Sequence, residues 1–573
     1  MLLTPSGEPA GDMDRTMLLS LWTKQLVIEG KSKSYYRVGM GRPTYPLNAD
    51  TAMFAAWYWL SLALRSAVAT IGLSLLKYFP FFNPHDFVSL LSPAIDYGHP
   101  QGELLARRRM SLALNQWYGR EVEINEKNIL FTVGGAAGLH IIFNVINRKM
   151  PNGRILTQFP HYSLYRGSHG QNNLFAISVM DASGYKLNAA QLDSSIKRAY
   201  QLGEIDGGFP SAFLFCDPNN PLATALNKNE LRAIAEILRK YPLLYIILDE
   251  AYAEMRLDGD RVSLLSVAPD LKNRIILMRS ATKALSAAGE RMAVTVAFDS
   301  KLMEELVAEN IGICGHAPKS LQHAFAHAME KLTPKKQRKL IDYYAPQMTF
   351  VGRRIKEMGA QMPDASYCAA GTFYALANLS DFIGSPINKE CFRAIKRASV
   401  QEDGLALIET DEEIVYHLLF TYGIMAAPFS YFGISNKLGY IRITCSAGNR
   451  ELHELMDKLE VALKAARAFK HGCLATTEVI VSANQKPSSL ETLPHEKAKD
   501  LISVLNLHSF KNPHQELDFI EMWSVFVKES TSSQAVREYL LDFSIEQILS
   551  FKPFITYQRE AGGVSGLSLS SVH

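Results

Sequence analysis

Short apolar runs alternate with longer stretches of helical periodicity between about residues 128 and 298. The runs are five to seven residues long and rich in β-branched and aromatic residues, whereas the stretches between them repeat apolar positions every three or four residues. Uninterrupted apolar strands separated by helices are typical of a mainly parallel sheet covered on both faces, so we predict a large α/β domain. Its strands are expected at 128–133, 154–158, 174–179, 211–216, 244–249, 274–280 and 294–298.

The second half of the chain mixes helices with only a few strands. Strands are predicted at 371–379 and 440–445 and a helix at 451–469, which together indicate a smaller α+β domain. Near Cys473 the periodicity gives way to a polar segment that predicts a linker, and amphipathic helices follow it. We therefore expect four parts: an N-terminal arm with part of the small domain (1–95), the large domain (96–310), the small C-terminal domain (311–470), and a linker plus helical extension of unknown role (471–573).

One stretch, residues 53–76, is apolar enough to suggest a membrane span. Arg65 lies at its middle, and a charge at the centre of a bilayer costs about 2.5–3.5 kcal/mol. The segments on both sides have the composition of a globular protein. We therefore expect a buried helix or a helix at a subunit interface, and no membrane partner.

Composition and charge exclude several other classes of protein. The 60 basic and 57 acidic residues leave a net charge of +3, which gives no electrostatic reason to expect a nucleic-acid partner. The six cysteines show no CxxC pair and no regular spacing, so we expect reduced thiols and no metal site. The first residues lack a basic region followed by an apolar one, which predicts no secretory signal and a cytoplasmic protein.

Candidate chemistry follows the ends of the predicted strands, where ligands gather in parallel sheets. Asp249 ends a buried strand, where a carboxylate is costly unless it is paired; a helix cap is the structural alternative. Lys283 follows the next strand, with Arg291 eight residues further on. A lysine acts as a nucleophile when its unprotonated form is accessible, and an arginine binds phosphate through two parallel hydrogen bonds.

The segment 280–283 together with Arg291 resembles the SxSK…GxR signature of class I/II aminotransferases, which depend on pyridoxal 5'-phosphate (PLP) and adopt fold type I of the aspartate aminotransferase superfamily. The resemblance implies that Lys283 holds the cofactor as a Schiff base. It also implies that Ser280 and Arg291 bind the cofactor phosphate. The fold expected from it is a fold-type I PLP transferase.

Two further segments resemble the same family. Asp249 and Tyr252 match its DExY pattern, which implies that Asp249 keeps the ring nitrogen protonated and that Tyr252 contacts the phenolic oxygen of the cofactor. The run 217–221 resembles the NPxNPTG turn, with Asp217 in place of the first asparagine and Leu-Ala in place of Thr-Gly. Asn220 is retained, and the resemblance gives it contact with the same oxygen and a place beside the substrate.

The resemblance also implies residues for the phosphate cradle and for ring stacking. Gly134, Gly135 and Ala136 lead from a strand into a helix, where backbone N–H groups can approach a phosphate. Tyr162 follows the strand 154–158, at the position where an aromatic side chain stacks on the cofactor ring. An ordinary half-buried tyrosine is the alternative for Tyr162.

The remaining implied residues concern the substrate and a second subunit. Tyr97 resembles the tyrosine that reaches the phosphate of the neighbouring subunit, which implies a homodimer with shared active sites. Arg442 lies where the family binds the substrate carboxylate, and Gly41 lies in a segment that resembles the loop covering the substrate. Arg42 is unusual in that loop and is either a solvent-exposed charge or a sign of an acidic substrate.

The order of these residues carries more weight than any one of them. They appear along residues 35–468 in the order that the family requires. The expected activity is therefore transfer of an amino group between an amino acid and a 2-oxo acid. A PLP-dependent decarboxylase or lyase of the aspartate β-decarboxylase type is an alternative on the same scaffold. A regulator built on an inactive aminotransferase is disfavoured by the intact Lys283.

Overall fold

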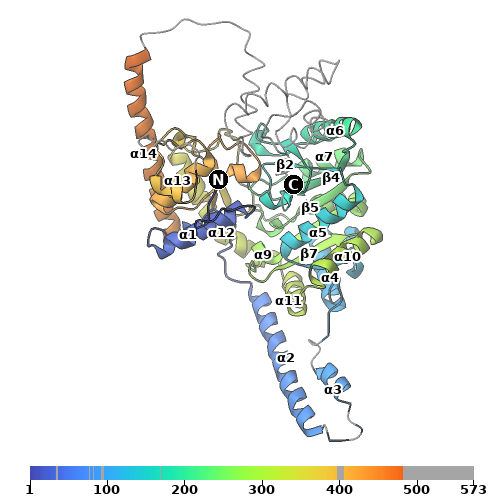
Figure 1. Cartoon of the computed structure of the whole chain (residues 1–573). Coiled ribbons are helices and arrows are strands. Elements are labelled where there is room, and N and C mark those ends of the chain that lie inside the picture. Colours follow the sequence, from blue (N-terminus) through green and yellow to red (C-terminus); the bar gives the residue numbers. More distant parts are fainter. Residues whose placement is uncertain are drawn as a thin grey trace, which may run out of the picture.

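The predicted apolar strands form one seven-stranded sheet in the order β1-β7-β6-β5-β4-β2-β3 (Figure 1). Strand β7 runs antiparallel to both neighbours, and the other four pairs are parallel. The connection from β6 to β7 is shorter than a parallel crossover needs, so the chain returns antiparallel. The strands are β1 (Ile129–Val133), β2 (Arg154–Phe159), β3 (Leu174–Ser178), β4 (Pro210–Cys216), β5 (Tyr245–Asp249), β6 (Ile275–Ser280) and β7 (Met292–Ala297).

The computed structural model describes residues 1–481, apart from 34–35, 77, 80, 82, 92–95, 168–169 and 397–405. The α/β class and the mainly parallel sheet predicted from the sequence are confirmed within this part. The helices predicted for the C-terminal extension lie outside the described residues.

Helices cover both faces of the sheet because successive strand residues point to opposite sides. On β4, Phe213 and Phe215 join one apolar core, whereas Leu214 joins another. The first core includes α4 (Leu104–Tyr118), α6 (Ala189–Asp206), α7 (Lys228–Arg239), α8 (Leu264–Val267) and α11 (Lys319–Glu330). The second includes α5 (Gly134–Lys149) and α10 (Ser300–Cys314).

A smaller α+β part surrounds a three-stranded antiparallel sheet in the order β8-β10-β9. The N-terminal segment packs into the same core, where the ring centroids of Trp22 and Phe420 lie 5.3 Å apart. The elements of this part are α1 (Arg15–Ile28), α12 (Pro334–Glu357), β8 (Tyr374–Asn378), α13 (Asp411–Tyr422), β9 (Ala427–Pro428), β10 (Tyr440–Thr444) and α14 (Asn449–Val481).

Two elements extend further than the sequence predicted. Helix α11 contributes Phe325 and Ala326 to the core of the large sheet, so the large part of the molecule extends past residue 310. Helix α14 continues to Val481, although a linker was expected from residue 471. The chain has no proline between Pro428 and Pro487, so no helix-breaking proline ends α14 earlier.

Helix α2 (Ala49–Leu76) projects from the body of the molecule, with the short α3 (Pro84–Leu91) beside it (Figure 1). Its base packs on α11, where the rings of Phe54 and His327 lie 5.0 Å apart. The expectation of a buried helix is wrong, since only 6% of its most apolar 18-residue window is buried. Among the described residues, α2 is the one helix long and apolar enough to cross a membrane by length and composition alone.

Candidate active site

The carboxyl ends of six strands meet at one edge of the large sheet. Strands β2, β3, β4, β5 and β6 are parallel, and β1 shares their direction because both β1 and β6 are antiparallel to β7. The segments that leave these ends carry most of the site residues predicted from the sequence: Gly134, Gly135, Ala136, Tyr162, Asn220, Asp249, Tyr252, Ser280 and Lys283.

Lys283 lies on the single helical turn α9 (Ala281–Ala284), directly after β6. Its Nζ donates a hydrogen bond to the carbonyl oxygen of Gly41 and lies 5.7 Å from the centre of the Tyr252 ring. Burial, together with the cations Arg442 and Arg291, lowers the pKa of Lys283 to about 7, while Asp249 acts against them. A substantial fraction of this amine is therefore uncharged near neutral pH, as a nucleophilic lysine requires.

Asp249 ends β5 in a fully buried position. One carboxylate oxygen accepts a hydrogen bond from the Tyr165 hydroxyl at 2.6 Å, and the other accepts one from the Ala251 backbone N–H at 3.1 Å. Burial raises the pKa of Asp249, while these hydrogen bonds and Lys283 oppose the rise. The bond to Ala251 gives Asp249 a local structural role, and its position beside Lys283 leaves it able to pair with a cationic ring nitrogen.

Arg291 lies over the N-terminus of α5. Gly134 begins this helix with φ +79°, and a Cβ built there would lie 2.6 Å from Arg291 Nη2. Val133 precedes the helix and provides no side-chain cap for the first backbone N–H groups. An uncapped helix N-terminus beside a guanidinium is a suitable anion site, and a glycine is needed for this close approach.

Hydroxyl groups complete this cradle. The Ser280 hydroxyl donates to Thr282 Oγ1 at 2.7 Å and accepts from the Thr282 backbone N–H at 3.2 Å. A Cβ built at Gly135 would lie 3.6 Å from Ser280 Cβ, which places α5 and β6 in close contact. Ala136 completes the first residues of α5. The donors present fit the phosphate of PLP, because they combine backbone N–H, hydroxyl and guanidinium groups.

Arg442 is buried in β10 with 3% of its surface exposed. Its Nη1 donates to Asn220 Oδ1 at 2.6 Å and its Nη2 to the carbonyl oxygen of Gly39 at 2.7 Å. The guanidinium lies 4.2 Å from the centre of the Tyr374 ring. Among the described residues, Arg442 Nε has no hydrogen-bond partner and no carboxylate lies within ion-pair distance. A buried cation with only neutral partners is costly, so this environment suits a carboxylate ligand.

Tyr252, Tyr374 and Gly41 meet at the same place from three separate segments. The hydroxyl oxygens of Tyr252 and Tyr374 lie 2.5 Å apart. A Cβ built at Gly41 would lie 2.1 Å from the Tyr374 hydroxyl, so only glycine allows this approach of the N-terminal loop. Burial raises the pKa of both tyrosines, which keeps their hydroxyls protonated. Sequence reasoning missed Tyr374, although it lies on a strand that was predicted.

Tyr162 lies at the end of the β2 segment, where its ring packs edge-on against Tyr165 with the centroids 5.6 Å apart. The preceding His161 is buried and its Nδ1 lies 2.8 Å from the Tyr162 carbonyl oxygen. Burial lowers the pKa of His161 to about 3, so this imidazole is neutral. Sequence reasoning missed His161 and Tyr165; the position of His161 directly after a strand end was the available signal.

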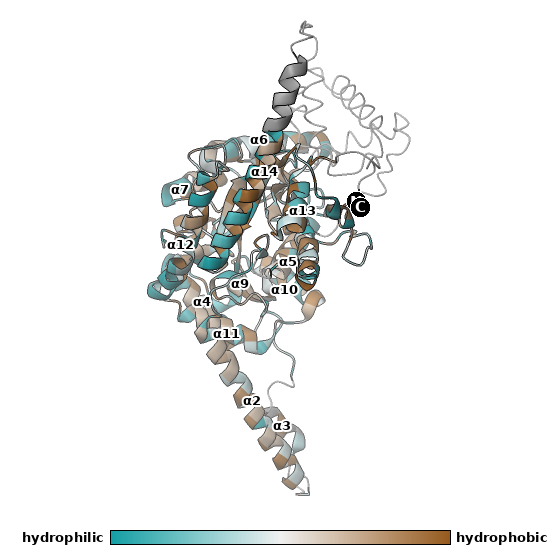
Figure 2. Ribbon diagram, turned by 90° about the vertical axis from the view of Figure 1, so that its left-hand side faces the viewer, coloured by the Kyte–Doolittle hydropathy of each residue, from teal (hydrophilic) through white to brown (hydrophobic). Residues whose placement is uncertain are grey.

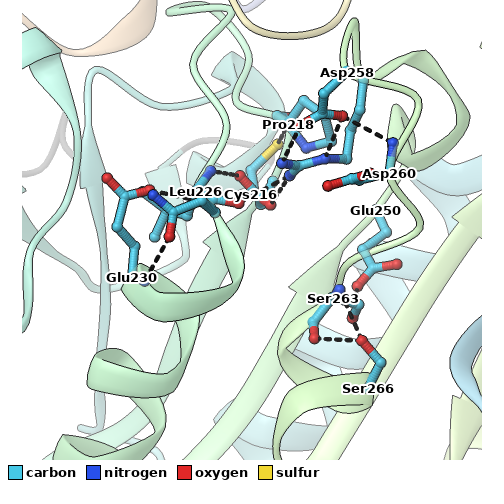
Figure 3. Close-up of polar contacts among 12 residues, drawn as sticks. Cys216, Pro218, Leu226, Glu230, Glu250, Asp258, Asp260, Ser263 and Ser266 are labelled. Carbon is cyan, nitrogen blue, oxygen red and sulfur yellow. Dashed lines mark hydrogen bonds and ion pairs between the residues drawn. The ribbon is translucent and has the colours of Figure 1, made fainter.

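Asp217, which replaces the first asparagine of the family turn, has a structural partner in Arg256. Figure 3 shows the neighbours Pro218, Leu226 and Asp258 close together around this pair. The two ions lie 3.2 Å apart, and the Asp217 carboxylate also accepts from the Leu226 backbone N–H at 2.9 Å. Arg256 forms a second ion pair with Asp258 at 3.0 Å. Burial raises the pKa of Asp217 to about 7, with Arg256 opposing the rise. These contacts hold the turn that presents Asn220.

Two predicted residues lie away from this cluster. Tyr97 is 95% exposed, beside His316 in a cavity of about 450 Å³ at the base of α2. Among the described residues it contacts none of the other predicted site residues, so its role stays a prediction that requires a second subunit. Arg42 has an exposed side chain, in line with the reading of this residue as a solvent-exposed charge.

The family model for aminotransferase class I and II matches residues 94–459, and the chain therefore belongs to this family. It is an enzyme of the transferase class, and the family is generally PLP-dependent. The chain is 22% identical over 337 residues to a putative aminotransferase, YugH, of Bacillus subtilis, across 58% of this chain and 75% of that protein. It is also 22% identical over 338 residues to a probable aspartate/prephenate aminotransferase of Rhizobium leguminosarum bv. phaseoli, across 57% and 75%.

Solved structures confirm the fold. The aspartate aminotransferase of Rhizobium meliloti matches with a TM-score of 0.58 at 16% identity, over 80% of this chain and 99% of that one. The aspartate aminotransferase of Thermus thermophilus with maleate matches with a TM-score of 0.57 at 14% identity, over 78% and 95%. The resemblance to fold-type I aminotransferases predicted from the sequence is confirmed.

Proposed function

We propose that this enzyme is a PLP-dependent aminotransferase that transfers an amino group between an amino acid and a 2-oxo acid, with Lys283 carrying the cofactor as a Schiff base. The observation that carries the proposal is the buried Lys283, whose pKa is lowered to about 7 beside Asp249 and Arg442. A surface lysine would be charged at neutral pH and unable to attack an aldehyde.

The residues around Lys283 would each contact a different part of the cofactor. Arg291, Ser280 and the N-terminus of α5 at 134–136 would hold the phosphate. Asp249 would pair with the ring nitrogen, Tyr252 and Asn220 would donate to the phenolic oxygen, and Tyr162 would lie against the ring. Bound there, PLP supplies an aldehyde carbon and an electron-withdrawing ring.

The substrate would be oriented by Arg442, whose planar fork suits a carboxylate. Gly41 and its loop would cover the substrate and exclude water, since this loop already contacts Lys283 Nζ. Lys283 Nζ, once released, would accept the proton from the α-carbon of the amino acid and deliver it again. Its lowered pKa leaves it able to do both near neutral pH.

Borohydride reduction followed by peptide mapping tests the attachment point. The expected result is one reduced cofactor adduct, at Lys283, and none in the Lys283→Ala variant. An adduct at any other lysine contradicts the proposal.

A screen of amino donors tests the reaction itself. Mixing the enzyme with one amino acid at a time should convert the cofactor absorbance to that of the amine form, and a 2-oxo acid should restore it. Aspartate and glutamate are the first donors to try, because relatives are named aspartate/prephenate aminotransferases. Release of carbon dioxide or ammonia without a 2-oxo acid acceptor would instead identify a decarboxylase or lyase.

A further inference from the structure

Seven large apolar side chains form one stripe along α2, the helix that projects from the body and that is brown for much of its length in Figure 2. They are spaced three or four residues apart, and each is between 52% and 66% exposed. We call this set the α2 stripe; it consists of Met53, Trp57, Leu60, Leu64, Val68, Ile71 and Leu75.

The contacts that α2 makes within the chain lie beside the stripe and opposite it. Its buried residues include Leu62, Ala69 and Gly72, and a Cβ built at Gly72 would lie 2.3 Å from the Phe87 ring of α3. Successive residues of a helix are turned by about 100°, so Leu62 points about 160° away from Leu64, whereas Gly72 points only about 80° away. Helix α3 therefore borders the stripe at Gly72, and the seven stripe side chains stay more than half exposed beside α3 and α11.

The spacing of the stripe is typical of a seam between two helices. Its members are spaced 4, 3, 4, 4, 3 and 4 residues apart, which is an eleven-residue period and keeps them on one side of the helix, as in a helix pair with a right-handed supercoil. Small side chains flank it on one side at Ala63, Ala67 and Ser74, which would allow a second helix to approach closely. Trp59 is the one other large apolar side chain of α2 that is exposed; it points about 140° away from Leu64 and lines the cavity beside Tyr97 at the base of the helix.

The charge of Arg65 separates a helix partner from a lipid partner. Arg65 is exposed and lies about 100° around the helix from Leu64, outside the stripe. In a helix pair it would remain in water. In a bilayer every side of α2 would face hydrocarbon, and Arg65 would cost about 2.5–3.5 kcal/mol near the centre.

The area of the stripe matches a stable contact between proteins. The exposed parts of its seven side chains amount to about 800 Å², which is close to the area that each partner contributes to an interface of standard size. An apolar patch of this size is unusual on a monomer. The stripe is also nearly symmetric about Leu64, its central member, so two copies of it can pair about a two-fold axis.

We propose that the α2 stripe is the contact surface for the α2 helix of a second copy of this chain, with the two helices packed side by side about a two-fold axis. The pairing lies outside the catalytic site and does not depend on the proposed reaction. It is also separate from the role proposed for Tyr97.

Oxidative cross-linking tests the pairing in the full-length protein. The exposed Cys314 and Cys368, together with Cys473, are first replaced by serine. Leu64→Cys is then compared with Ser66→Cys, which is also exposed but points about 160° away. Leu64 is the central member of the stripe, so it lies next to Leu64 of the second copy whether the two helices run parallel or antiparallel. Only Leu64→Cys should therefore form a covalent dimer. Equal cross-linking of both variants, or none in Leu64→Cys, would overturn the proposal.

A second measurement does not depend on the geometry of a disulfide. Leu64→Glu should lower the mass of the assembly measured by light scattering, because it places a charge in the seam, whereas Ser66→Glu should leave the mass unchanged. An unchanged mass in Leu64→Glu counts against the pairing. Both variants must retain the circular dichroism of the parent protein.

Lipid vesicles test the alternative occupant. A charged maleimide that does not enter bilayers should label the thiol of Ser66→Cys readily and that of Leu64→Cys slowly, with or without phosphatidylcholine and phosphatidylglycerol vesicles. If the protein floats with the vesicles and both thiols become protected only when vesicles are present, the occupant is lipid and the proposal fails.

Discussion

At the scale of single residues, Arg442 and Lys283 carry the strongest functional signals because each is a buried cation with few compensating charges. Arg442 has neutral partners, Asn220 and Gly39, and an unpaired Nε among the described residues. Lys283 responds to its burial by a lowered pKa, whereas an arginine stays charged in proteins. The two side chains therefore suit different tasks: one binds a carboxylate, and the other gains and loses a proton.

Replacing Arg442 tests the carboxylate site. Arg442→Lys keeps the charge but removes the two-pronged geometry, so we expect kcat/KM for the amino donor to fall about 30-fold or more, mainly through KM, for a loss of about 2 kcal/mol. Arg450→Lys, in an exposed position, is the matched control. Steady-state kinetics with one donor at varied concentration gives the comparison. An unchanged KM in Arg442→Lys would remove Arg442 from the substrate site.

The lowered pKa of Lys283 predicts a pH dependence of stability in the cofactor-free protein. Between pH 7 and 10.5 the unfolded chain holds a proton on Lys283 that the folded chain has lost, so the free energy of unfolding rises with pH in this window. Below pH 7 the burial penalty is fully present. Lys283→Met lacks the penalty and should be more stable than the parent by a few kcal/mol at pH 6.5, with the difference shrinking toward pH 10.5.

Urea unfolding of both proteins at pH 6.5, 8 and 9.5 measures this difference. A constant gap across the three pH values would show that Lys283 does not change its protonation in this range.

At the scale of elements, the sequence predicted what local patterning determines. The strand over 211–216 follows from an uninterrupted apolar run, and the fully buried β4 confirms it. Asp249 and Lys283 could be placed because they come directly after such runs. Tyr165 and Tyr374 could not, since a buried aromatic in a loop or strand looks the same in sequence whether it packs in a core or lines a site. The sequence left two alternatives for α2, a helix buried in its own chain or one at a subunit interface, because an apolar helix shows the same pattern in both.

The close contact at the start of α5 gives a prediction about one element. In Gly134→Ala the new methyl group would meet Arg291 and the backbone would be strained at φ +79°, so we expect weaker cofactor binding and a loss of about 1–3 kcal/mol in stability. Gly312→Ala makes the same change on the exposed face of α10, where a Cβ meets nothing, and should stabilise by about 0.5–1 kcal/mol.

Thermal unfolding and titration with the cofactor measure both effects. If Gly134→Ala binds PLP as tightly as the parent, the N-terminus of α5 is not the phosphate site.

At the scale of the whole molecule, the exposed Tyr97 predicts that active sites are shared between subunits. Tyr97→Phe should weaken PLP binding about tenfold to a hundredfold, which corresponds to the loss of one hydrogen bond to a charged group. A hybrid of Tyr97→Phe and Lys283→Ala chains should regain one tight site per dimer, because the intact Lys283 and the intact Tyr97 then come from different copies. Equilibrium binding on tagged, purified hybrids measures this.

If each chain used its own Tyr97, the hybrid would not regain a site that binds PLP tightly. In that case Tyr97→Phe would be equally defective in the hybrid and in the parent assembly.

The core of the small α+β part also has a consequence for how the chain is made. Trp22 packs against Phe420, so the N-terminal segment needs residues translated almost four hundred positions later. At about 5–20 residues per second, a ribosome takes roughly 20 to 80 seconds to make them. The strands and helices around the large sheet, from α4 to α11, are all synthesised within that interval. During this interval the apolar side of α1 has no partner to pack against and stays exposed. We therefore expect a ribosome-associated chaperone to bind α1 while the rest of the chain is synthesised.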